Sequence, residues 1–520
     1  MRGGRLWASV LCAAVVAVGA GGCQLVSPDK KDKGPIRVGT TDTITSLDPA
    51  GAYDAGSWEL FSNLYQSLLT FSPGSDKPVP DAARSCAFQN ADLRTYVCEL
   101  RDGLTFADGR EMTAEDVKYS FDRIRRIKSP QGPAPLLTTL TSVQAAGRRV
   151  LFHLGVPDAT FPFKIATGAG SIVDPRRYPA DRLRPDNPDN PVSGSGPYVL
   201  KEYAAGSTAR LQPNSRYRGS IKSVGGDVTV RFFSSPAKMS RAWRERAVDV
   251  VARQMPPTDL AALSPTDDDL RVMENSGAAT RSMVFNVRPG SPMKDRAVRQ
   301  AIAAVVDRET IARDVHHRTV EPLFSLIPRG LTGHSTPFFD AYPKPDPARA
   351  RALLRDAGIT TPVRFDLAYS QGAATGDEAA LLREQLEATG LFKVDTHWVE
   401  WKKFQEGYAK GEYDAYCVGW LADFPDPDTF IAPLVGADSS LHSGYRDPRV
   451  EELIRATERE DLRGRTAKNY RAIQKTIAQD VPMLPLWQKK DYVLSGKSIS
   501  GTQYLSDGTS IWRLWKLNRI

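Results

Sequence analysis

The sequence predicts an α/β protein with more than one domain, and three observations lead to that prediction. The chain has 520 residues, which is too long for one compact hydrophobic core. Across residues 363–420, strand-like apolar stretches alternate with helical patterns, as they do in α/β lobes. Residues 157–197 are rich in Pro, Gly, Asp and Asn, and a long segment of that kind is usually functional or marks a domain boundary. We therefore expect two or three domains.

Composition and charge are those of an ordinary globular protein. Hydrophobic residues make up 41% of the chain and charged residues 25%, both close to the average. The net charge of +8 arises from 69 basic and 61 acidic residues that are interleaved along the chain. A nucleic-acid-binding protein would need a basic stripe or a known binding module. We therefore expect no nucleic-acid partner.

The first 22 residues have the layout of a secretory signal peptide. Arg2 and Arg5 form a basic start, residues 6–18 are continuously apolar, and residues 19–22 are small. This apolar stretch is too short to span a membrane as a helix. The sequence therefore predicts an exported protein.

Cys23 directly follows the small residues, and the segment resembles the signal of bacterial lipoproteins. In that signal the cysteine is lipidated and becomes the first residue, although Ala20 stands here where Leu is usual. The alternative is an ordinary cleaved signal with an incidental Cys23. Residues 23–35 are charged and lack apolar periodicity, as flexible tethers do. The resemblance implies a lipid anchor on the outer face of the bacterial cytoplasmic membrane.

The remaining cysteines are expected to have structural roles. Cys86 and Cys98 lie on the two strands of a predicted hairpin, residues 84–88 and 93–100. Cysteines that face each other across a hairpin in an exported protein indicate a disulfide, which contributes about 3 kcal/mol for a loop of this size. Cys417 lies within an apolar strand and is expected to be a small buried hydrophobe.

In the first half of the chain, local patterns favour a mixture of strands and helices. Leu60, Leu64 and Leu68 recur at four-residue steps and predict a helix over 57–69. Thr113, with Asp116 three residues later, has the pattern of a helix cap. A further helix is expected at 238–249, and strands are expected at 36–39 (edge-like), 84–88, 93–100, 104–109, 198–203, 227–233 and 282–287.

In the second half, helices and strands alternate more regularly. Asp346 and Pro347 start a helix and Gly358 ends it, as a cap, a first-turn proline and a C-terminal glycine commonly do. The other expected helices are 295–306, 377–389, 401–409, 447–458 and 466–479, and the expected strands are 363–369, 393–399 and 413–420. Residues 492–515 are strand-like and aromatic, and are expected to return to the first domain.

Asp423 is the most informative candidate for a binding residue. It follows the buried strand 413–420 and stands beside Trp420 and Phe424. A lone carboxylate at the end of such a strand suits the capture of a cationic group on a ligand. The alternative is that Asp423 only caps a turn, since Asp often bonds its own backbone there.

With these elements in place, the chain is similar to the solute-binding proteins of bacterial peptide importers, the oligopeptide- and dipeptide-binding family (extracellular family 5). The resemblance extends over about 36–487. It rests on motifs that are weak singly but occur in the family's order: LDP at 47–49, LYQSL at 64–68, LRDGLTFADG at 100–109, TAEDV at 113–117, SF at 120–121, GSGPY at 194–198, FN at 285–286, VRQAI at 298–302, DR at 307–308 and the segment 413–430.

The resemblance implies a two-lobed periplasmic-binding-protein-like fold with a subdomain inserted in the first lobe. Lobe I would comprise 36–282, with the insert at about 57–190, and lobe II would comprise 283–490. Residues 491–520 would return to lobe I. Such a protein captures short peptides in the cleft between its lobes and passes them to the membrane permease of an ABC importer. The resemblance implies a monomer with no cofactor.

The resemblance also implies a ligand-binding site. In peptide-binding relatives the acid that follows the Gly-Trp strand binds the α-ammonium of the ligand, and Asp423 occupies that position here. The peptide backbone is held mainly by main-chain groups. Arg329 is a candidate for binding the ligand carboxylate, and the other candidate ligand-binding residues are Trp420, Phe424, Gly419 and Asn286.

Other functions remain open at this point. The chain has no Gly-x-Ser-x-Gly motif and its six histidines show no helical metal-binding pair, so we expect neither an enzyme with catalytic residues nor a metal site. The same fold could bind a nickel complex, an oligosaccharide or another non-peptide solute. A signalling lipoprotein with a vestigial cleft is a further alternative.

Overall fold

The computed structural model describes residues 34–185, 192–264, 266–267, 269–370, 372–506, 508–509 and 511–520, and for Ser276 the backbone alone. The expected signal peptide, Cys23 and most of the tether lie outside these residues. Residues 34–520 form one compact unit. Within the described part of the chain, no helix has the length and apolar character needed to cross a membrane.

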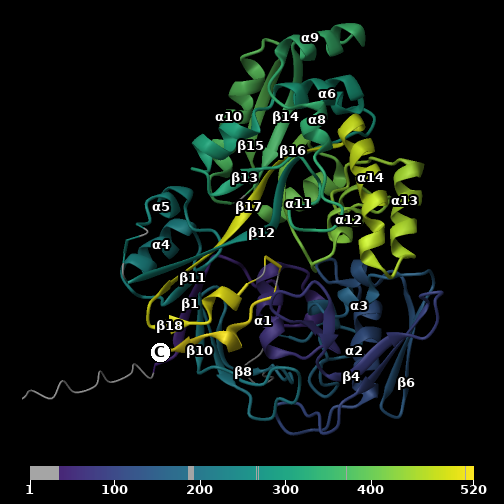
Figure 1. Ribbon diagram of the computed structural model, residues 1–520, viewed down its shortest axis with the longest axis vertical. Coiled ribbons are helices and arrows are strands. Elements are labelled where there is room, and N and C mark those ends of the chain that lie inside the picture. Colours follow the sequence, from purple (N-terminus) through teal and green to yellow (C-terminus); the bar gives the residue numbers. More distant parts are fainter. Residues whose placement is uncertain are drawn as a thin grey trace, which may run out of the picture. The chain divides into compact units, whose positions relative to one another are not determined.

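A mixed sheet of 11 strands runs through this unit (Figure 1). Its order is β15-β14-β16-β12-β17-β11-β1-β10-β9-β8, and β13 pairs with β17 outside that order. The strands from β11 to β8 in this order build the first lobe, and β15, β14 and β16 build the second. Two long strands in the middle, β12 and β17, belong to both.

The first lobe contains both ends of the described chain. β1 lies between β10 and β11 and is parallel to both, so it is a central strand and the expectation of an edge strand was wrong. Its strands are β1 (Ile36–Thr40), β8 (Tyr198–Ala204), β9 (Thr208–Pro213), β10 (Val228–Phe232) and β11 (Val250–Ala252), and its helices are α1 (Ala55–Leu64), α4 (Pro236–Arg244) and α5 (Pro257–Ala261). A short pair of strands, β18 (Ile499–Ser500) and β19 (Asn518–Arg519), ends the chain beside this lobe's core.

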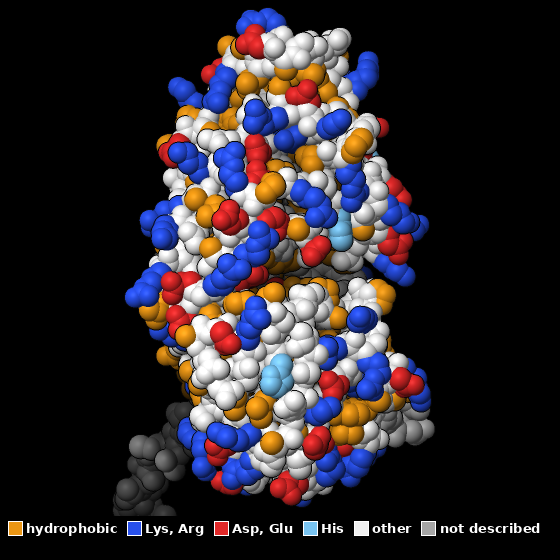
Figure 2. Space-filling view, turned by 90° about the vertical axis from the view of Figure 1, so that its right-hand side faces the viewer, with side chains coloured by type: hydrophobic (Ala, Val, Ile, Leu, Met, Phe, Trp, Pro, Cys, Tyr) orange, Lys and Arg blue, Asp and Glu red, His pale blue; other side chains and the backbone are white. Residues whose placement is uncertain are grey.

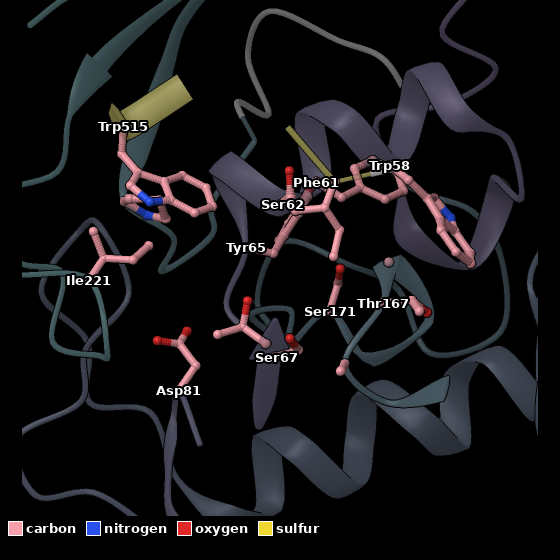
Figure 3. Close-up of a pocket in the computed structure, with 15 residues that line it drawn as sticks. Trp58, Phe61, Ser62, Tyr65, Ser67, Asp81, Thr167, Ser171, Ile221 and Trp515 are labelled. Atoms are coloured by element: carbon pink, nitrogen blue, oxygen red, sulfur yellow. The ribbon is translucent and has the colours of Figure 1, made fainter. Parts of the chain in front are cut away.

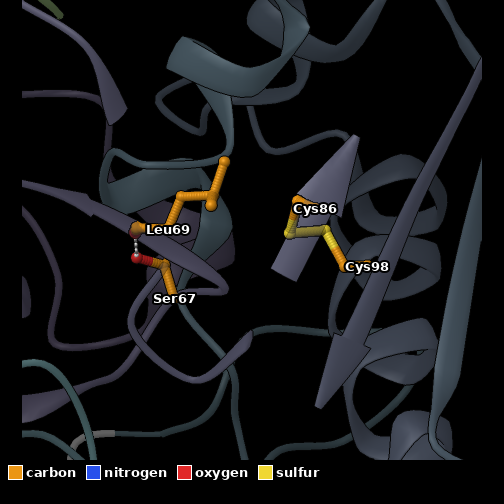
Figure 4. Close-up of a disulfide and its surroundings, with 4 residues drawn as sticks. All are labelled: Ser67, Leu69, Cys86 and Cys98. Atoms are coloured by element: carbon orange, nitrogen blue, oxygen red, sulfur yellow. Dashed lines mark hydrogen bonds between the residues drawn. A yellow bond between two sulfur atoms is a disulfide. The ribbon is translucent and has the colours of Figure 1, made fainter. Parts of the chain in front are cut away.

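A separate four-stranded sheet, ordered β4-β5-β7-β6, forms a subdomain inserted between α1 and β8. Its apolar face packs with α2 into a core of its own. The elements are β2 (Leu69–Phe71), β3 (Pro78–Pro80), β4 (Ala83–Phe88), β5 (Thr95–Leu100), α2 (Ala114–Ile127), β6 (Leu140–Ala146), β7 (Arg149–Leu154) and α3 (Phe161–Lys164). The predicted Cys86–Cys98 disulfide joins β4 to β5 and is confirmed (Figure 4).

The second lobe has the βαβα order that the sequence predicted. β14 (Val363–Tyr369) lies between β15 (Phe392–Trp398) and β16 (Ala415–Leu421) and is parallel to both. Helices surround these strands and share the largest core of the protein. The remaining elements are α6 (Arg296–Val305), α7 (Arg308–Thr310), β13 (Val320–Pro322), α8 (Pro337–Ala341), α9 (Pro347–Asp356), α10 (Thr375–Glu387), α11 (Trp401–Lys410), α12 (Ala432–Val435), α13 (Pro448–Glu458) and α14 (Ala467–Asp480).

The lobes are joined by β12 (Leu270–Phe285) and β17 (Met483–Gly496), which are antiparallel neighbours. One half of this pair lies beside β11 of the first lobe and the other half beside β16 of the second. The pairing register shifts between Ser276 and Thr280, where the strands pass from one lobe to the other. The lobe boundaries expected at 282 and 490 fall within these two strands.

Several predicted elements differ from the structure. The helix expected over 57–69 ends at Leu64, because the chain turns there and Leu68 enters the core of the inserted subdomain instead. No strand forms over 104–109, where a single bridge from Thr105 to Glu111 closes a turn. The segment 157–185 has little regular structure, yet many of its side chains are buried.

Candidate ligand-binding site

The edge of the second lobe that faces the first lobe carries the candidate site. β14, β15 and β16 are parallel, so their carboxyl ends meet at the same edge, which is where open α/β sheets usually bind ligands. Asp423 follows β16 at this edge. Figure 2 shows a groove across the surface between the two lobes, with acidic and basic side chains along its upper rim.

Asp423 contacts both lobes. Its Oδ2 accepts a hydrogen bond from the Tyr53 hydroxyl of the first lobe at 2.7 Å and another from Thr429 of its own lobe at 3.3 Å. The Tyr53 ring in turn stacks on Trp58, with ring centroids 5.2 Å apart. Oδ1 of Asp423 has no hydrogen-bond partner among the described residues. One carboxylate oxygen is therefore held in place while the other remains available.

Burial changes the acidity of Asp423. The residue is 7% exposed, and burial raises its pKa to about 7 although the hydrogen bonds from Tyr53 and Thr429 oppose the rise. No lysine or arginine of the described chain forms an ion pair with it. A buried carboxylate that lacks a cation is costly, so this position favours a ligand that brings a positive charge. Thr429 also accepts from the Asp423 backbone N–H at 3.1 Å, which shows that the turn is shaped around the side chain.

The three residues near Asp423 in sequence are placed differently. Trp420 is partly buried and donates from Nε1 to the Thr429 carbonyl at 2.7 Å. Gly419 is exposed, and the space where a side chain would lie is open, with only the Thr280 carbonyl within 4 Å. Phe424 is buried in the core of the inserted subdomain, against Phe163 with ring centroids 5.9 Å apart. Phe424 therefore joins the lobes directly instead of lining a cavity.

The structure does not bring Asn286 to this site. Its backbone N–H donates to the carbonyl of Asp414, and its side chain donates to the carbonyl of Gly411. It therefore lies at the far end of β16, and 7 residues of strand separate it from the end that carries Asp423, a span of about 23 Å at about 3.3 Å per residue. Asn286 stabilises the distal end of the second lobe.

Arg329 lies on the surface of the protein. Its side chain is 60% exposed and pairs with Glu321 at 3.3 Å, while its backbone N–H donates to Gln488 of β17. The residue lies beside the strands that join the lobes, with its guanidinium already bound to a carboxylate. The structure gives it no contact with Asp423.

A buried polar cluster lies on the face of β12 and β16 that carries Gly419. Arg281 stands directly opposite Gly419, and its Nε donates to Glu378 at 2.9 Å. Glu378 also accepts from Trp487 at 2.5 Å and lies 3.2 Å from His316. Burial opposes its ionisation, but Arg281 and His316 hold the pKa of Glu378 down to about 2. This cluster fixes α10 to the sheet near the site.

The structure also contains a small cavity inside the first lobe (Figure 3). Its volume is about 30 Å³, which is room for one or two water molecules and too small for a peptide. Trp58, Tyr65, Asp81 and Trp515 are among the residues that line it. The described residues include no cluster of three or more His, Cys, Asp or Glu side chains suited to a metal ion.

Comparison with known proteins identifies the class to which this fold and site belong. The family model of the bacterial extracellular solute-binding proteins, family 5, matches residues 77–441. The chain belongs to this family.

Particular relatives agree with that result. The chain is 28% identical over 500 residues to di/tripeptide-binding protein 2 of Pseudomonas aeruginosa, covering 90% of this chain and 92% of the relative. The crystal structure of the dipeptide-binding protein of Pseudoalteromonas sp. SM9913 in complex with Met-Leu has a TM-score of 0.81 at 20% identity and covers 94% and 100% of the two chains. The Escherichia coli murein tripeptide-binding protein MppA has a TM-score of 0.80 at 21% identity and covers 94% and 99%. The predicted family and two-lobed α/β fold are confirmed.

Proposed function

We propose that this protein captures short peptides between its two lobes and delivers them to the permease of an ABC importer. The observation that carries this proposal is Asp423, a buried carboxylate at the meeting of the lobes that has no cation of its own. A peptide supplies that cation as its α-ammonium. The names of the relatives support the same class of ligand, and the protein acts as a binding protein without catalysis.

In this proposal Oδ1 of Asp423 receives the ammonium while Tyr53 and Thr429 hold Oδ2 in place. The open space over Gly419 leaves room for peptide backbone beside β16, where main-chain groups bind the ligand as an added strand would. We expect Trp420, which the Thr429 carbonyl holds in place, and Phe424, which packs against Phe163 of the other lobe, to keep water away from the bound ammonium. Because the backbone is held mainly by main-chain groups, the protein accepts different side chains.

The test combines one substitution with one change in the ligand. Asp423→Asn should weaken a peptide with a free amine far more than the same peptide after N-acetylation, which removes the charge. A charge pair in a closed cleft is poorly screened, so losing one partner costs about 2–5 kcal/mol, or roughly thirty-fold to several thousand-fold in affinity. Calorimetric titration of both ligands against both proteins gives the coupling energy directly.

A coupling energy near zero would show that Asp423 is only a turn residue, and would shift the proposal toward a sugar or a metal complex. The ligand class can be established independently. Protein purified without denaturation and then denatured should release short peptides that mass spectrometry identifies. Release of a nickel complex or an oligosaccharide instead would contradict the peptide assignment.

We further propose that lipid on Cys23 tethers the protein to the outer face of the bacterial cytoplasmic membrane. The support is the basic, apolar and small-residue layout that precedes Cys23. Cys23→Ala should release the protein from membranes, which fractionation and immunoblotting would detect. Unchanged membrane retention of this variant would contradict the proposal.

A further inference from the structure

Four charged residues meet in a second contact between the lobes, which we call the seam. Asp158 and Lys164 belong to the inserted subdomain, whereas Asp428 and Glu458 belong to the second lobe. The seam is closed, because the backbone N–H of Ala159 donates to the carbonyl of Glu458 at 2.8 Å. In Figure 1 the seam lies where α3 meets the lower end of α13, on the side away from β12 and β17.

The charges of the seam do not balance. Lys164 pairs with Asp158, Nζ to Oδ2 at 2.8 Å, and this pair is buried. Burial opposes both charges, but Lys164 lowers the pKa of Asp158 and Asp158 raises the pKa of Lys164. Among the described residues Lys164 forms an ion pair with Asp158 alone, and its charge acts on Asp428 and Glu458 only from a longer distance.

Arg463, the neighbouring arginine, is likewise paired with another carboxylate. Arg463 binds both oxygens of Asp426, at 2.7 and 2.8 Å, and also donates to the Tyr470 hydroxyl. Arg455 faces Glu458 from the same helix, but its side chain is exposed. Asp428, which is buried, and Glu458, which is partly buried, are thus two carboxyls at this contact that form no ion pair with a described residue.

The surroundings of Asp428 also show a carboxylate without a partner. The residue is 4% exposed, and its Oδ1 is buried without a hydrogen-bond partner. A buried carboxylate oxygen without a partner is costly when charged, and protonation removes that charge. Burial raises the pKa of Asp428 to about 6; Lys164 and Arg463 oppose this rise, and Asp426 and Asp158 add to it. Burial, together with Asp428 and Asp158, raises the pKa of Glu458 to about 7.

We propose that the seam is a latch that takes up protons as the lobes close, so that acidification favours the closed lobes. When the lobes separate, water reaches Asp428 and Glu458, and their acidity returns toward that of free carboxyls, with pKa values of about 4. The closed form therefore binds more protons than the open form. By linkage, the added stability of the closed form is complete below about pH 4 and is lost as the pH rises through about 6 to 7.

The test measures lobe separation without any ligand, so its outcome does not depend on what the cleft binds. Fluorescent labels on Ser142→Cys, exposed on β6, and on Leu462→Cys, 51% exposed beyond α13, report the distance across the seam. Because Asp423 is a third carboxyl that enters the interface, the experiment uses the Asp423→Asn protein. The ratio of closed to open protein should fall at least tenfold between pH 5 and pH 7.

Three variants assign this dependence to the seam. Glu458→Gln and Asp428→Asn keep the shape of each side chain but cannot titrate, so each should flatten the pH dependence and favour closure at pH 8. Glu452→Gln is the matched control, because Glu452 is an exposed glutamate on the same helix, and it should leave the curve unchanged. Having two independent variants keeps the test decisive if one of them fails to fold.

Two results would overturn the proposal. The first is a lobe distance in the Asp423→Asn protein that does not change between pH 5 and pH 8. The second is a pH dependence that persists unaltered in both seam variants, which would place the titrating groups elsewhere. In either case the four residues of the seam would be a structural contact only.

Discussion

At the residue scale, the hydrogen bond from Tyr53 to Asp423 joins the lobes through one hydroxyl group. The two residues are 370 positions apart in the chain. Tyr53 fixes the carboxylate from the first lobe, whereas Thr429 fixes it from the second. The charge at the candidate site is therefore placed correctly only when the lobes are together.

Tyr53→Phe removes this hydroxyl and keeps the ring that stacks on Trp58. Hydrogen bonds to charged groups contribute about 1.5–3 kcal/mol, so affinity for a free-amine peptide should fall roughly ten- to hundred-fold, measured by calorimetry. Tyr119→Phe is the control, because it removes a hydroxyl that donates to the Tyr178 carbonyl inside the first lobe. Equal losses for both variants would mean that Tyr53 does not act through Asp423.

Sequence reasoning could find Asp423 but not its partner. Asp423 follows a recognisable strand and stands beside aromatic residues, and these are local signals. Tyr53 carries no such signal, since its role depends on a contact that forms only after both lobes have folded. The same reason explains Phe424, whose aromatic character was evident but whose contact with Phe163 was not. Asn286 shows the opposite case, where a motif that is distinctive in sequence lies far from the site.

At the element scale, a buried ion pair anchors α2 to the start of the first lobe. Both oxygens of Asp48 accept from Arg123 of α2 at 2.6 Å, and the two residues are 0% and 1% exposed. Asp48 also accepts from the backbone N–H groups of Ala50 and Arg184. One carboxylate thus connects three segments that are distant in the chain.

Asp48→Ala should lower the free energy of unfolding by about 3–5 kcal/mol, because it leaves the Arg123 guanidinium buried without a counter-charge. Urea denaturation measures this loss. Asp102→Ala is the control: Asp102 pairs with Arg84 at 2.9 Å, but the side chains are 66% and 59% exposed, and exposed pairs contribute about 0–1 kcal/mol. A small effect of Asp48→Ala would contradict the structural role assigned to this pair.

Elements with strong local signals were predicted well from the sequence. The strand at 363–369 matches β14, and the capping box of Thr113 and Asp116 starts α2 as expected. β9 and β11 were missed, and β12 and β17 are much longer than expected. β11, β12 and β17 are defined by partners up to hundreds of residues away, so their own residues carry little evidence of them, whereas β9 pairs with its chain neighbours β8 and β10 and was missed for want of a local signal.

At the scale of the whole molecule, the lobes are connected where β12 and β17 pass side by side from one to the other, which we call the crossing. Gly277 lies at the register shift, and a Cβ atom there would come within 2.4 Å of the Lys489 carbonyl on the neighbouring strand. The two backbones can approach this closely because Gly277 has no side chain. The close approach is located where the pair passes between the lobes.

Gly277→Ala should force the strands apart and lower the free energy of unfolding by about 1–3 kcal/mol, again measured with urea. Gly496→Ala is the matched control on β17, since a Cβ there would meet only the Ser498 hydroxyl, at 3.9 Å. The distance between the lobes, followed by X-ray scattering in solution, should also change for Gly277→Ala alone. Identical behaviour of the two variants would rule out a special role for the crossing.

In mechanical terms, β12 and β17 form a narrow strap, which β13 widens along Trp487, Gln488 and Lys489. Hydrogen bonds along both strands resist stretching and sliding, whereas bending or twisting a narrow ribbon breaks few of them. The lobes can therefore swing about the strap more easily than they can slide apart. The seam lies on the side away from the strap (Figure 1). A small rotation at the strap therefore becomes a large displacement at Glu458 and Lys164. Contacts far from the strap thus have the greatest leverage over opening, whereas a ligand held near the strap needs little movement to be enclosed.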